Sequence, residues 1–280
     1  MGMKRGLWLV LLTLFAMVMA SCGNTGKGNS ESLSSASPGE TSEPVSLYKI
    51  ATDASYAPME MMDKDKITGF DIDFLAEVMK QAGLSYEVEN TGWDSLMTSL
   101  SSNKSAFSAA ISAISITSER EQTYDFSAPY FESTNMIVSK AGSGIQSALD
   151  LKGKKVAVQG GTTADEIMTG IMGEGSTDLK RFDSNTLALL ELASGGADAV
   201  VADIAVVKEY IKNNPDAKLE GVVDKQNFST EFYGIMFPKG GELKAKLDPA
   251  IQAVITNGKY AEIYQKWFGE EPDTAALLNP

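Results

Sequence analysis

The strongest constraint on the fold is a regular alternation of strand-like and helix-like segments in the first half of the chain. Residues 47–52 alternate in the manner of a β-strand, and apolar side chains recur at helical spacing over 74–79. A further strand pattern covers 86–89, and a further helix pattern covers 93–100. Strands that alternate with helices predict an α/β sheet, and polar residues that follow such strands meet at its carboxyl edge.

The same alternation starts again after Tyr130, which predicts more strands and helices of the same kind. The expected strands cover 135–138, 155–158, 197–202 and 232–238, and the expected helices cover 186–193, 204–210, 243–256 and 260–268. A chain of 280 residues with 43% hydrophobic residues is long enough for one large or two small domains with a sizeable core.

Residues 112–131 combine the end of a buried apolar segment with polar groups that suit a carboxylate ligand. Ser115 supplies a hydroxyl, and Arg120 supplies a guanidinium a few residues later. A guanidinium beside hydroxyls and backbone N–H groups is a good receptor for a carboxylate. The alternative is that Arg120 pairs with Glu119 or Glu121 on a solvated turn.

Two further polar segments follow predicted strands. The glycine turn in 159–166 leads into a helix start, where N–H groups and hydroxyls favour an anion such as a carboxylate; the alternative is a capped helix start. It lacks the lysine of a Walker phosphate loop and the spacing of a dinucleotide-binding motif, so phosphate is disfavoured. Asp203 follows the strand 197–202, and it is either a binding residue or an ordinary helix N-cap.

The residue composition excludes several classes of function. The chain has no histidine, which excludes a Ser-His-Asp or Cys-His enzyme and disfavours most metalloenzymes. Its single cysteine, Cys22, excludes an internal disulfide. The 37 acidic residues outnumber the 24 basic ones, and no basic stripe is present, so nucleic acid is disfavoured as a partner. We expect no cofactor and no bound metal.

Residues 1–22 have the organisation of an export signal. Lys4 and Arg5 precede an apolar run over residues 7–20, and small residues stand just before Cys22. As a helix, this run would span about 21 Å, short of the roughly 30 Å of membrane hydrocarbon. The length therefore favours a cleaved signal over a permanent anchor.

The end of this segment resembles a bacterial lipobox, in which the cysteine becomes the lipidated first residue of the mature protein. The resemblance implies lipidation of Cys22, although Met19 replaces the more usual leucine. The alternative is an ordinary signal whose cleavage site happens to hold a cysteine. Residues 23–45 are mostly Gly, Ser, Glu and Pro, and they predict a flexible tether. Together these features predict a protein of the cell envelope, lipid-anchored to the membrane and facing the periplasm or the cell exterior.

Seven stretches of the chain carry a family resemblance when they are taken in order. They are TDASYAPM (52–59), GFDIDFLAEV (69–78), SITSER with DFSAPY (115–120 and 125–130), LKGKKVAVQGGTT (151–163), GGADAVVAD (195–203), YGIMFPKG (233–240) and NGKYAEIYQKWFG (257–269). Together they resemble the polar amino-acid-binding members (family 3) of the extracytoplasmic solute-binding proteins of ABC importers, over residues 46–270.

This resemblance implies an α/β, two-lobed periplasmic-binding-protein fold of type II, with two crossing hinge strands. Lobe one would comprise residues 46–133 and 233–280, and lobe two residues 134–232. The implied function is to bind a free amino acid between the lobes and to deliver it to an ABC permease, as a monomer.

For the groups that all amino acids share, the resemblance implies a clamp of opposite charges from opposite lobes. Arg120 would bind the ligand α-carboxylate, while Asp203 and the carbonyl of Ala113 would bind the α-ammonium. The remaining carboxylate contacts would come from Ser115, Thr162 and Thr163. Closure of the lobes would exclude water and strengthen each of these charged hydrogen bonds.

For the ligand side chain, the resemblance implies a pocket of Asp53, Tyr56, Met59, Trp93 and Gln159. Tyr56 and Trp93 suit a flat cationic group, and Asp53 suits its charge, which favours a basic amino acid and arginine first. Gln159 supplies an amide rather than a second carboxylate, so a neutral polar ligand such as glutamine stays open.

Two other functions on a related fold are also open. A dehydratase-type enzyme would need a general acid or base in the cleft, but the acids expected there already have binding roles, so no catalytic residue is predicted. A sensor domain would continue into a membrane helix, whereas this sequence ends at Pro280 after an acidic tail.

Overall fold

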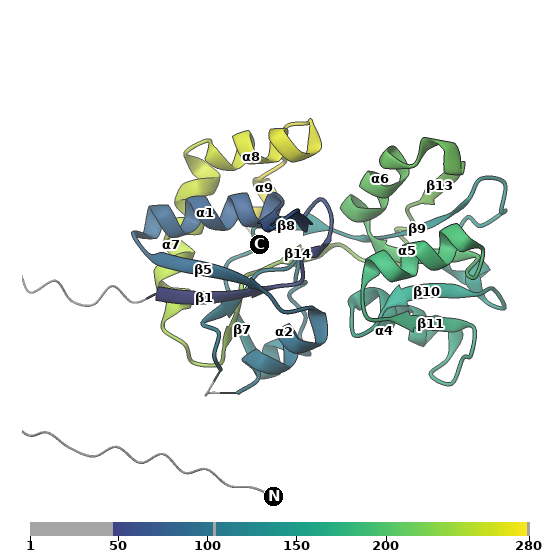
Figure 1. Cartoon of the computed structure of the whole chain (residues 1–280), viewed down its shortest axis with the longest axis horizontal. Helices are drawn as coiled ribbons and strands as arrows, with labels where there is room; N and C mark the ends of the chain where they lie inside the picture. The colour runs from purple at the N-terminus through teal and green to yellow at the C-terminus, as the bar shows by residue number, and fades with distance from the viewer. Residues whose placement is uncertain (1–46, 103–104, 279–280) are drawn as a thin grey trace, which may run out of the picture. The chain divides into compact units, whose positions relative to one another are not determined.

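The structure, a computed structural model, describes residues 47–102 and 105–278 (Figure 1). The predicted signal (1–22), the predicted tether (23–45) and the predicted lipidation site Cys22 lie outside these residues. Across the described part of the chain, none of the helices is both long and apolar enough to cross a membrane.

The first lobe is built on a five-stranded sheet, drawn on the left of Figure 1. β1 (Leu47–Thr52) lies between β5 (Ser85–Asn90) and β6 (Ala109–Ala110) and pairs with both in parallel. β15 (Met236–Pro238) and β7 (Tyr124–Phe126) complete the order β5-β1-β6-β15-β7 with antiparallel pairing.

Both faces of this sheet are buried. Successive residues of a strand point to opposite faces, so Ile50 and Ala51 of β1 enter different apolar cores. The core around Ile50 contains residues of α1 (Phe70–Ala82), α7 (Leu243–Thr256) and α8 (Lys259–Phe268). The core around Ala51 contains residues of α2 (Trp93–Leu100). Each fully buried large apolar side chain stabilises the fold by about 1.5–3 kcal/mol.

The second lobe repeats this plan with another five-stranded sheet. Its order is β11 (Leu179–Phe182), β10 (Val156–Gln159), β12 (Ala199–Asp203), β9 (Asn135–Lys140) and β13 (Leu219–Val222). β10 is parallel to β11 and β12, and β9 is antiparallel to β12 and β13. One core contains residues of α4 (Thr163–Met172), and the other contains residues of α5 (Asn185–Ser194) and α6 (Ile204–Asn213).

Four short helices complete the set of helices among the described residues. They are α3 (Arg120–Thr123) and α9 (Ala275–Leu278), together with the 3₁₀ helices η1 (Ala148–Leu151) and η2 (Pro215–Ala217).

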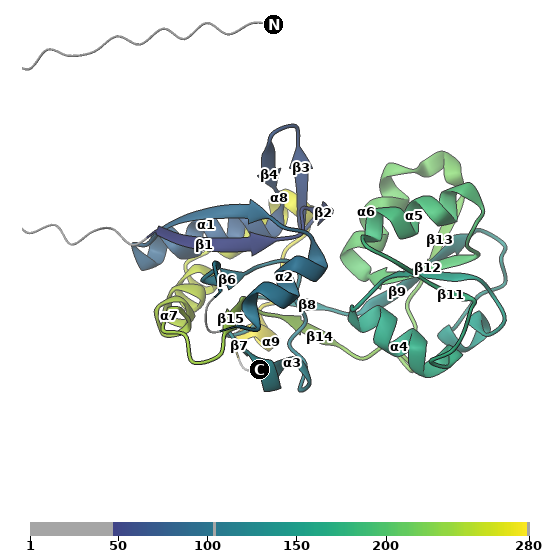
Figure 2. The ribbon, with the colours of Figure 1, turned by 60° about the horizontal axis from the view of Figure 1, so that its bottom comes forward.

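Two antiparallel strands connect the two sheets. The chain leaves the first sheet through β8 (Phe131–Ser133) and returns through β14 (Glu231–Tyr233), which pairs with β8 (Figure 2). This architecture confirms the predicted two-lobed α/β fold with two crossing strands.

The prediction of one continuous strand over 232–238 is wrong. The structure divides this segment into β14, which pairs with β8, and β15, which pairs with the first sheet. Gly234 lies at the break, and a Cβ added there would come within 3.0 Å of Ile116 and 3.2 Å of Phe126. The chain therefore changes partners at a point where a side chain would fit only if its neighbours shifted.

The sequence patterns also did not predict a three-stranded ribbon ahead of α1. It consists of β2 (Ser55–Tyr56), β3 (Glu60–Asp63) and β4 (Lys66–Thr68). Strands this short leave no recognisable alternation in the sequence.

No side chain caps the N-terminus of α1. Backbone carbonyls at the start of the ribbon accept hydrogen bonds from its first N–H groups instead. The N–H groups of Phe70 and Asp71 donate to the carbonyls of Pro58 (3.0 Å) and Met59 (2.9 Å). The backbone of residue 69 lies close to the backbone of Met59, so that a Cβ added to Gly69 would lie 2.0 Å from the Met59 carbonyl oxygen. Gly69 also has a φ of +146°, which residues with a side chain rarely adopt. Both the backbone angle and the space therefore require glycine at position 69.

Replacement of this glycine should be one of the more damaging small substitutions in the first lobe. Gly69→Ala should lower the free energy of unfolding in urea by more than about 2 kcal/mol, from backbone strain and the clash with Met59. The control is Gly142→Ala, where φ is +80° but an added Cβ meets nothing within 4 Å. This control should cost only about 1 kcal/mol of backbone strain. Equal losses for the two variants would contradict the close approach.

Candidate ligand-binding site

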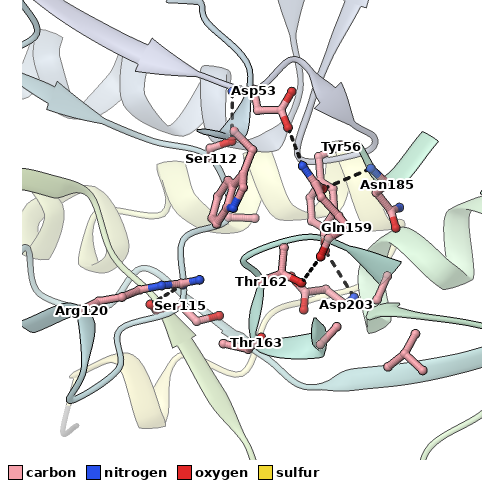
Figure 3. A pocket seen from close by; sticks show the side chains of 15 residues that line it. Asp53, Tyr56, Ser112, Ser115, Arg120, Gln159, Thr162, Thr163, Asn185 and Asp203 are labelled. Carbon is pink, nitrogen blue, oxygen red and sulfur yellow. Dashed lines mark hydrogen bonds between the residues drawn. The ribbon is translucent and has the colours of Figure 1, made fainter. Parts of the chain in front are cut away.

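A buried pocket lies between the two lobes and contains most of the side chains that the sequence predicted (Figure 3). From the first lobe it is lined by Asp53, Tyr56, Trp93, Ser112, Ala113, Ser115 and Arg120. From the second lobe it is lined by Gln159, Thr162, Thr163, Ala164, Asn185, Val201, Ala202 and Asp203. The carboxyl ends of β1, β10 and β12 all contribute, as expected for an α/β sheet.

Met59 is the one predicted pocket residue that the structure does not bring to this pocket. Its side chain is fully buried in the core of the first lobe with Phe70 and Phe74. The turn into the ribbon directs residue 59 inward, so that only Asp53 and Tyr56 of the segment 52–59 line the pocket.

Arg120 lies at the start of α3 and is only 6% exposed. Its Nη1 donates to the carbonyl of Ser115 (2.9 Å), its Nη2 donates to the carbonyl of Gly161 (3.3 Å), and its guanidinium lies 5.4 Å from the centre of the Trp93 ring. Among the described residues, these bonds engage two of the five N–H donors, so others are available to a ligand. This buried position does not fit the alternative of a solvated pair with Glu119 or Glu121.

Burial disfavours the charged form of the Arg120 guanidinium. Burial therefore lowers the pKa of Arg120 from its ordinary value, whereas the nearby acidic groups of Glu166, Glu231 and Asp203 raise it. A ligand carboxylate would add a further counter-charge beside the guanidinium.

Asp203 ends β12 and lies on the second-lobe side of the pocket, 6% exposed. It stands at the N-cap position of α6, but its side chain makes no capping hydrogen bond, so the simple N-cap alternative does not describe it. Its Oδ2 accepts a hydrogen bond from the Tyr233 hydroxyl (2.6 Å), and its backbone N–H donates to the Tyr56 hydroxyl (3.3 Å).

The surroundings of Asp203 disfavour its charged form. Burial, and then the nearby carboxylate of Glu231, raise the pKa of Asp203 to about 7, although hydrogen bonds from Tyr233 and Tyr56 and the charge of Arg120 lower it. A cation in the pocket would stabilise the ionised form, so this site favours a ligand ammonium group.

Asp53 and Gln159 form a bridge between the lobes at another part of the pocket. The Gln159 amide nitrogen donates to Asp53 Oδ2 (2.9 Å), and the Gln159 oxygen accepts from the Asn185 N–H (3.1 Å), which fixes the orientation of the amide. The Ser55 hydroxyl donates to Asp53 Oδ1 (2.8 Å). Asp53 therefore keeps its carboxylate in the pocket in a defined position.

Other bonds across the cleft end on backbone atoms. Trp93 Nε1 donates to the carbonyl of Gly161 (3.3 Å), and the Thr186 hydroxyl donates to the carbonyl of Ser55 (3.0 Å). With the bonds made by Arg120 and Tyr56, these contacts join the two lobes on either side of the pocket. The cleft is closed in this structure.

Glu231 was not predicted as part of the site, and it lies in β14 where the chain returns to the first lobe. Its carboxylate accepts hydrogen bonds from the hydroxyls of Ser115 and Thr163 (2.9 Å for Thr163) and from the amide of Asn135 (2.7 Å). The Thr163 hydroxyl, which we assigned to the ligand carboxylate, is thus bound by a protein carboxylate, whereas the Ser115 and Thr163 backbone N–H groups, which we also assigned to the ligand, are not used by Glu231. Nothing in the sequence signals this, because Glu231 has no motif of its own.

Thr162 likewise has a structural partner. Its hydroxyl donates to the carbonyl of Gln159 (2.9 Å) and accepts from the N–H of Asp165 (3.3 Å), which caps α4. The beginning of α4 therefore presents backbone N–H groups to the pocket, in the manner of a helix N-terminus that binds an anion.

The chain was compared with known proteins. The sequence profile of a family described as bacterial extracellular solute-binding proteins, family 3, matches residues 48–270. A probable histidine-binding protein of Neisseria gonorrhoeae is 36% identical over 280 residues, which cover 99% of this chain and 100% of that protein. A putative ABC transporter arginine-binding protein 2 of Escherichia coli (strain K12) is 37% identical over 224 residues, 79% of this chain and 90% of that protein.

A solved structure gives a similar result. The arginine-, lysine-, histidine-binding protein ArtJ of Geobacillus stearothermophilus matches with a TM-score of 0.81 and 50% sequence identity. The match covers 84% of this chain and 100% of that chain.

The raised pKa of Asp203 predicts how stability depends on pH. Because its pKa is about 7 in the folded protein and 3.8 ordinarily, the folded state binds more protons over this range, and stability should fall as the pH rises through it. Asp203→Asn should remove the part of this fall that Asp203 contributes and so make the pH dependence shallower, with a difference on the order of 2–4 kcal/mol between the two proteins near neutral pH.

The measurement is the free energy of unfolding of ligand-free protein in urea across this pH range. Asp216→Asn, a change at an exposed acid in η2, is the control and should leave the wild-type pH dependence unchanged. Parallel curves for the wild type and Asp203→Asn would contradict the prediction.

Proposed function

Because the chain belongs to family 3 of the bacterial extracellular solute-binding proteins, we propose that it binds a free amino acid with a basic side chain, arginine first. It delivers this amino acid to the membrane subunits of an ABC importer. The observation that carries the proposal is that Arg120 and Asp203, from different lobes, line one buried pocket. Membership of this family makes the chain a solute-binding protein and not an enzyme.

The α-carboxylate of the ligand binds beside Arg120. The guanidinium is held by the carbonyls of Ser115 and Gly161, so it is preorganised before the ligand arrives. Backbone N–H groups at Ser115 and at Thr163, the first residue of α4, complete this part of the site. Glu231 orients the two hydroxyls beside them.

The α-ammonium of the ligand binds Asp203 and the carbonyl of Ala113. The ammonium ionises Asp203, whose pKa in the empty site is about 7, so binding below this pH releases a proton from the carboxyl group. Both ends of the zwitterion are satisfied only when the two lobes meet, which couples binding to closure.

The ligand side chain extends toward Asp53, between Tyr56 and Trp93. Its positive charge faces the Asp53 carboxylate, which Ser55 and Gln159 hold in place. The similar proteins are named as probable histidine-binding, putative arginine-binding, and arginine-, lysine- and histidine-binding, which supports the same class of ligand. A neutral ligand such as glutamine would leave the buried Asp53 carboxylate without a cation, which disfavours it.

Movement between an open and a closed state is part of the proposal. Lobe one comprises residues 46–133 and 233–280, lobe two comprises residues 134–232, and the lobes rotate about β8 and β14. The membership of the two five-stranded sheets supports this division.

Lipidation at Cys22 and the tether over residues 23–45 complete the proposal for the whole chain. The lipid holds the monomeric receptor at the membrane, where its importer lies. Exchange of residues 1–22 for a cleavable export signal without a lipobox should release the receptor from the membrane fraction into the soluble fraction without changing its amino-acid affinity, which cell fractionation and calorimetry measure. Retention of the variant in the membrane fraction would contradict a lipid anchor.

Calorimetry of the chain from Gly23 onward against the twenty amino acids tests the ligand class. Arginine, lysine and histidine should bind, arginine most tightly, with a Kd near or below about 1 µM, about −8 kcal/mol. Small-angle scattering of the same samples should show compaction when arginine is added. Binding of glutamine or glutamate alone would overturn the basic-ligand proposal, and no binding at all would overturn the amino-acid proposal.

Asp53→Asn separates recognition of the side chain from recognition of the zwitterion. It should weaken arginine binding by about 10–100-fold, because the guanidinium loses its counter-charge. The matched control, Asp65→Asn, changes the same charge at an exposed residue in the turn of the ribbon and should bind as the wild type does. Equal arginine affinity in the two variants would rule out the proposed role of Asp53.

A further inference from the structure

Two carboxyl groups in the interior of the first lobe bind adjacent residues of the pocket wall, Ser112 and Ala113, and each affects the pKa of the other. Glu60 comes from β3 and Asp71 from the first turn of α1, and both are 0% exposed. Neither lines the pocket, and the proposed binding scheme uses neither of them.

Each carboxyl group holds a residue that lines the pocket. The hydroxyl of Ser112 donates to Glu60 Oε1 (2.7 Å), and the N–H of Ala113 donates to Asp71 Oδ2 (2.7 Å). The Tyr130 hydroxyl also donates to Asp71 Oδ2 (2.8 Å). One oxygen of each group, Oε2 of Glu60 and Oδ1 of Asp71, is buried without a donor.

The charges around the pair do not compensate two anions. The titratable groups that face it are Asp53, Tyr56, Tyr130 and Tyr260, and none of these described groups is a cation. Two adjacent carboxylates without a cation are unfavourable in a buried site, and one bound proton removes the repulsion.

The two groups also differ in how well they tolerate a charge. Burial and the neighbouring Asp71 raise the pKa of Glu60 well above its ordinary value. Burial raises the pKa of Asp71 to about 6, and hydrogen bonds from Ala113 and Tyr130 act to lower it. Asp71 is therefore the group that ionises more readily, and Glu60 is the group that keeps its proton.

We propose that Glu60 carries a proton at neutral pH, donates it in a hydrogen bond to Asp71, and forms with it a positioning pair that holds Ser112 and Ala113 in the pocket wall. This bond pairs the two oxygens that otherwise lack a donor. The other oxygen of each residue accepts a hydrogen bond from Ser112 or Ala113. All four carboxyl oxygens of the pair then have a hydrogen-bond partner.

The pair acts on the pocket through the backbone at Ser112 and Ala113, whose conformation it stabilises. Ala113 has a φ of +47°, an uncommon conformation for a residue with a side chain, and its N–H is bound by Asp71. The hydroxyl of Ser112 also accepts a hydrogen bond from the N–H of Asp53 (3.1 Å). The effect on ligand affinity rests on the proposed function, whereas the proton and the backbone contact do not.

Glu60→Gln tests the proton because glutamine has the shape and hydrogen-bonding groups of a protonated glutamate. Its oxygen still accepts from Ser112, and its amide still donates to Asp71. Arginine affinity should stay within about threefold of the wild type, whereas Glu60→Ala, which leaves Ser112 and Asp71 without partners, should weaken it by about tenfold or more. Similar losses for the two variants would overturn the proposal.

Infrared spectroscopy detects the proton without any ligand. At about pH 8, above the pKa of Asp203, the wild type should show the carbonyl band of a buried protonated carboxylic acid. Glu60→Gln should remove this band, and the control Glu89→Gln, at an exposed residue of β5, should keep it. A wild type without the band, or a band that persists in Glu60→Gln, would overturn the proton assignment.

Amide hydrogen exchange at Ala113 tests the positioning role, again without ligand. Exchange should be at least about tenfold faster in Glu60→Ala than in the wild type and unchanged in Glu60→Gln. Equal exchange in all three proteins would overturn the positioning role. If no amino acid bound the wild type, the proposed function would fail, while the infrared and exchange results would still decide the present proposal.

Discussion

Burial of charge between the lobes is the constraint on which the rest of this structure depends. Arg120 and Asp203 are both about 6% exposed, and neither forms an ion pair with the other in the closed cleft. A buried charge is costly unless it is paired or well hydrogen-bonded. The protein therefore surrounds Arg120 with carbonyls and Asp203 with hydroxyls, and the zwitterion that we propose as ligand would supply the counter-charges that the protein leaves out.

Most of the fold was predictable because it depends on long, regular patterns. The alternation of strands and helices, together with seven ordered stretches, was enough to predict two lobes and two crossing strands. The errors fall where the chain is short or changes partners. The ribbon at residues 55–68 has strands of two to four residues, and the segment 232–238 divides at Gly234, where tertiary packing decides the outcome.

The site was predictable in its members but not in its bonds. A motif identifies Arg120, Ser115 and Thr163, yet it does not tell which acceptor each hydroxyl has, and here that acceptor is Glu231. Met59 shows the same limit, because its side chain enters the core while its neighbours line the pocket. The raised pKa of Glu60 could not be predicted from the sequence either. It results from burial beside Asp71, and those surroundings exist only in the folded protein.

The contacts that hold the cleft closed have a consequence for how such a receptor changes over evolutionary time. Arg120 and Trp93 both donate to the carbonyl of Gly161, Thr186 donates to the carbonyl of Ser55, and the N–H of Asp203 donates to Tyr56. Each of these four contacts has a main-chain atom on one side, a carbonyl in three of them and an N–H in the fourth, and substitution of a main-chain carbonyl's own side chain does not remove it. A substitution at Ser55 therefore leaves its closing contact in place, whereas the bridge between Asp53 and Gln159 joins two side chains and is lost when either is replaced. The side-chain end of the pocket can thus change while main-chain contacts still close the cleft.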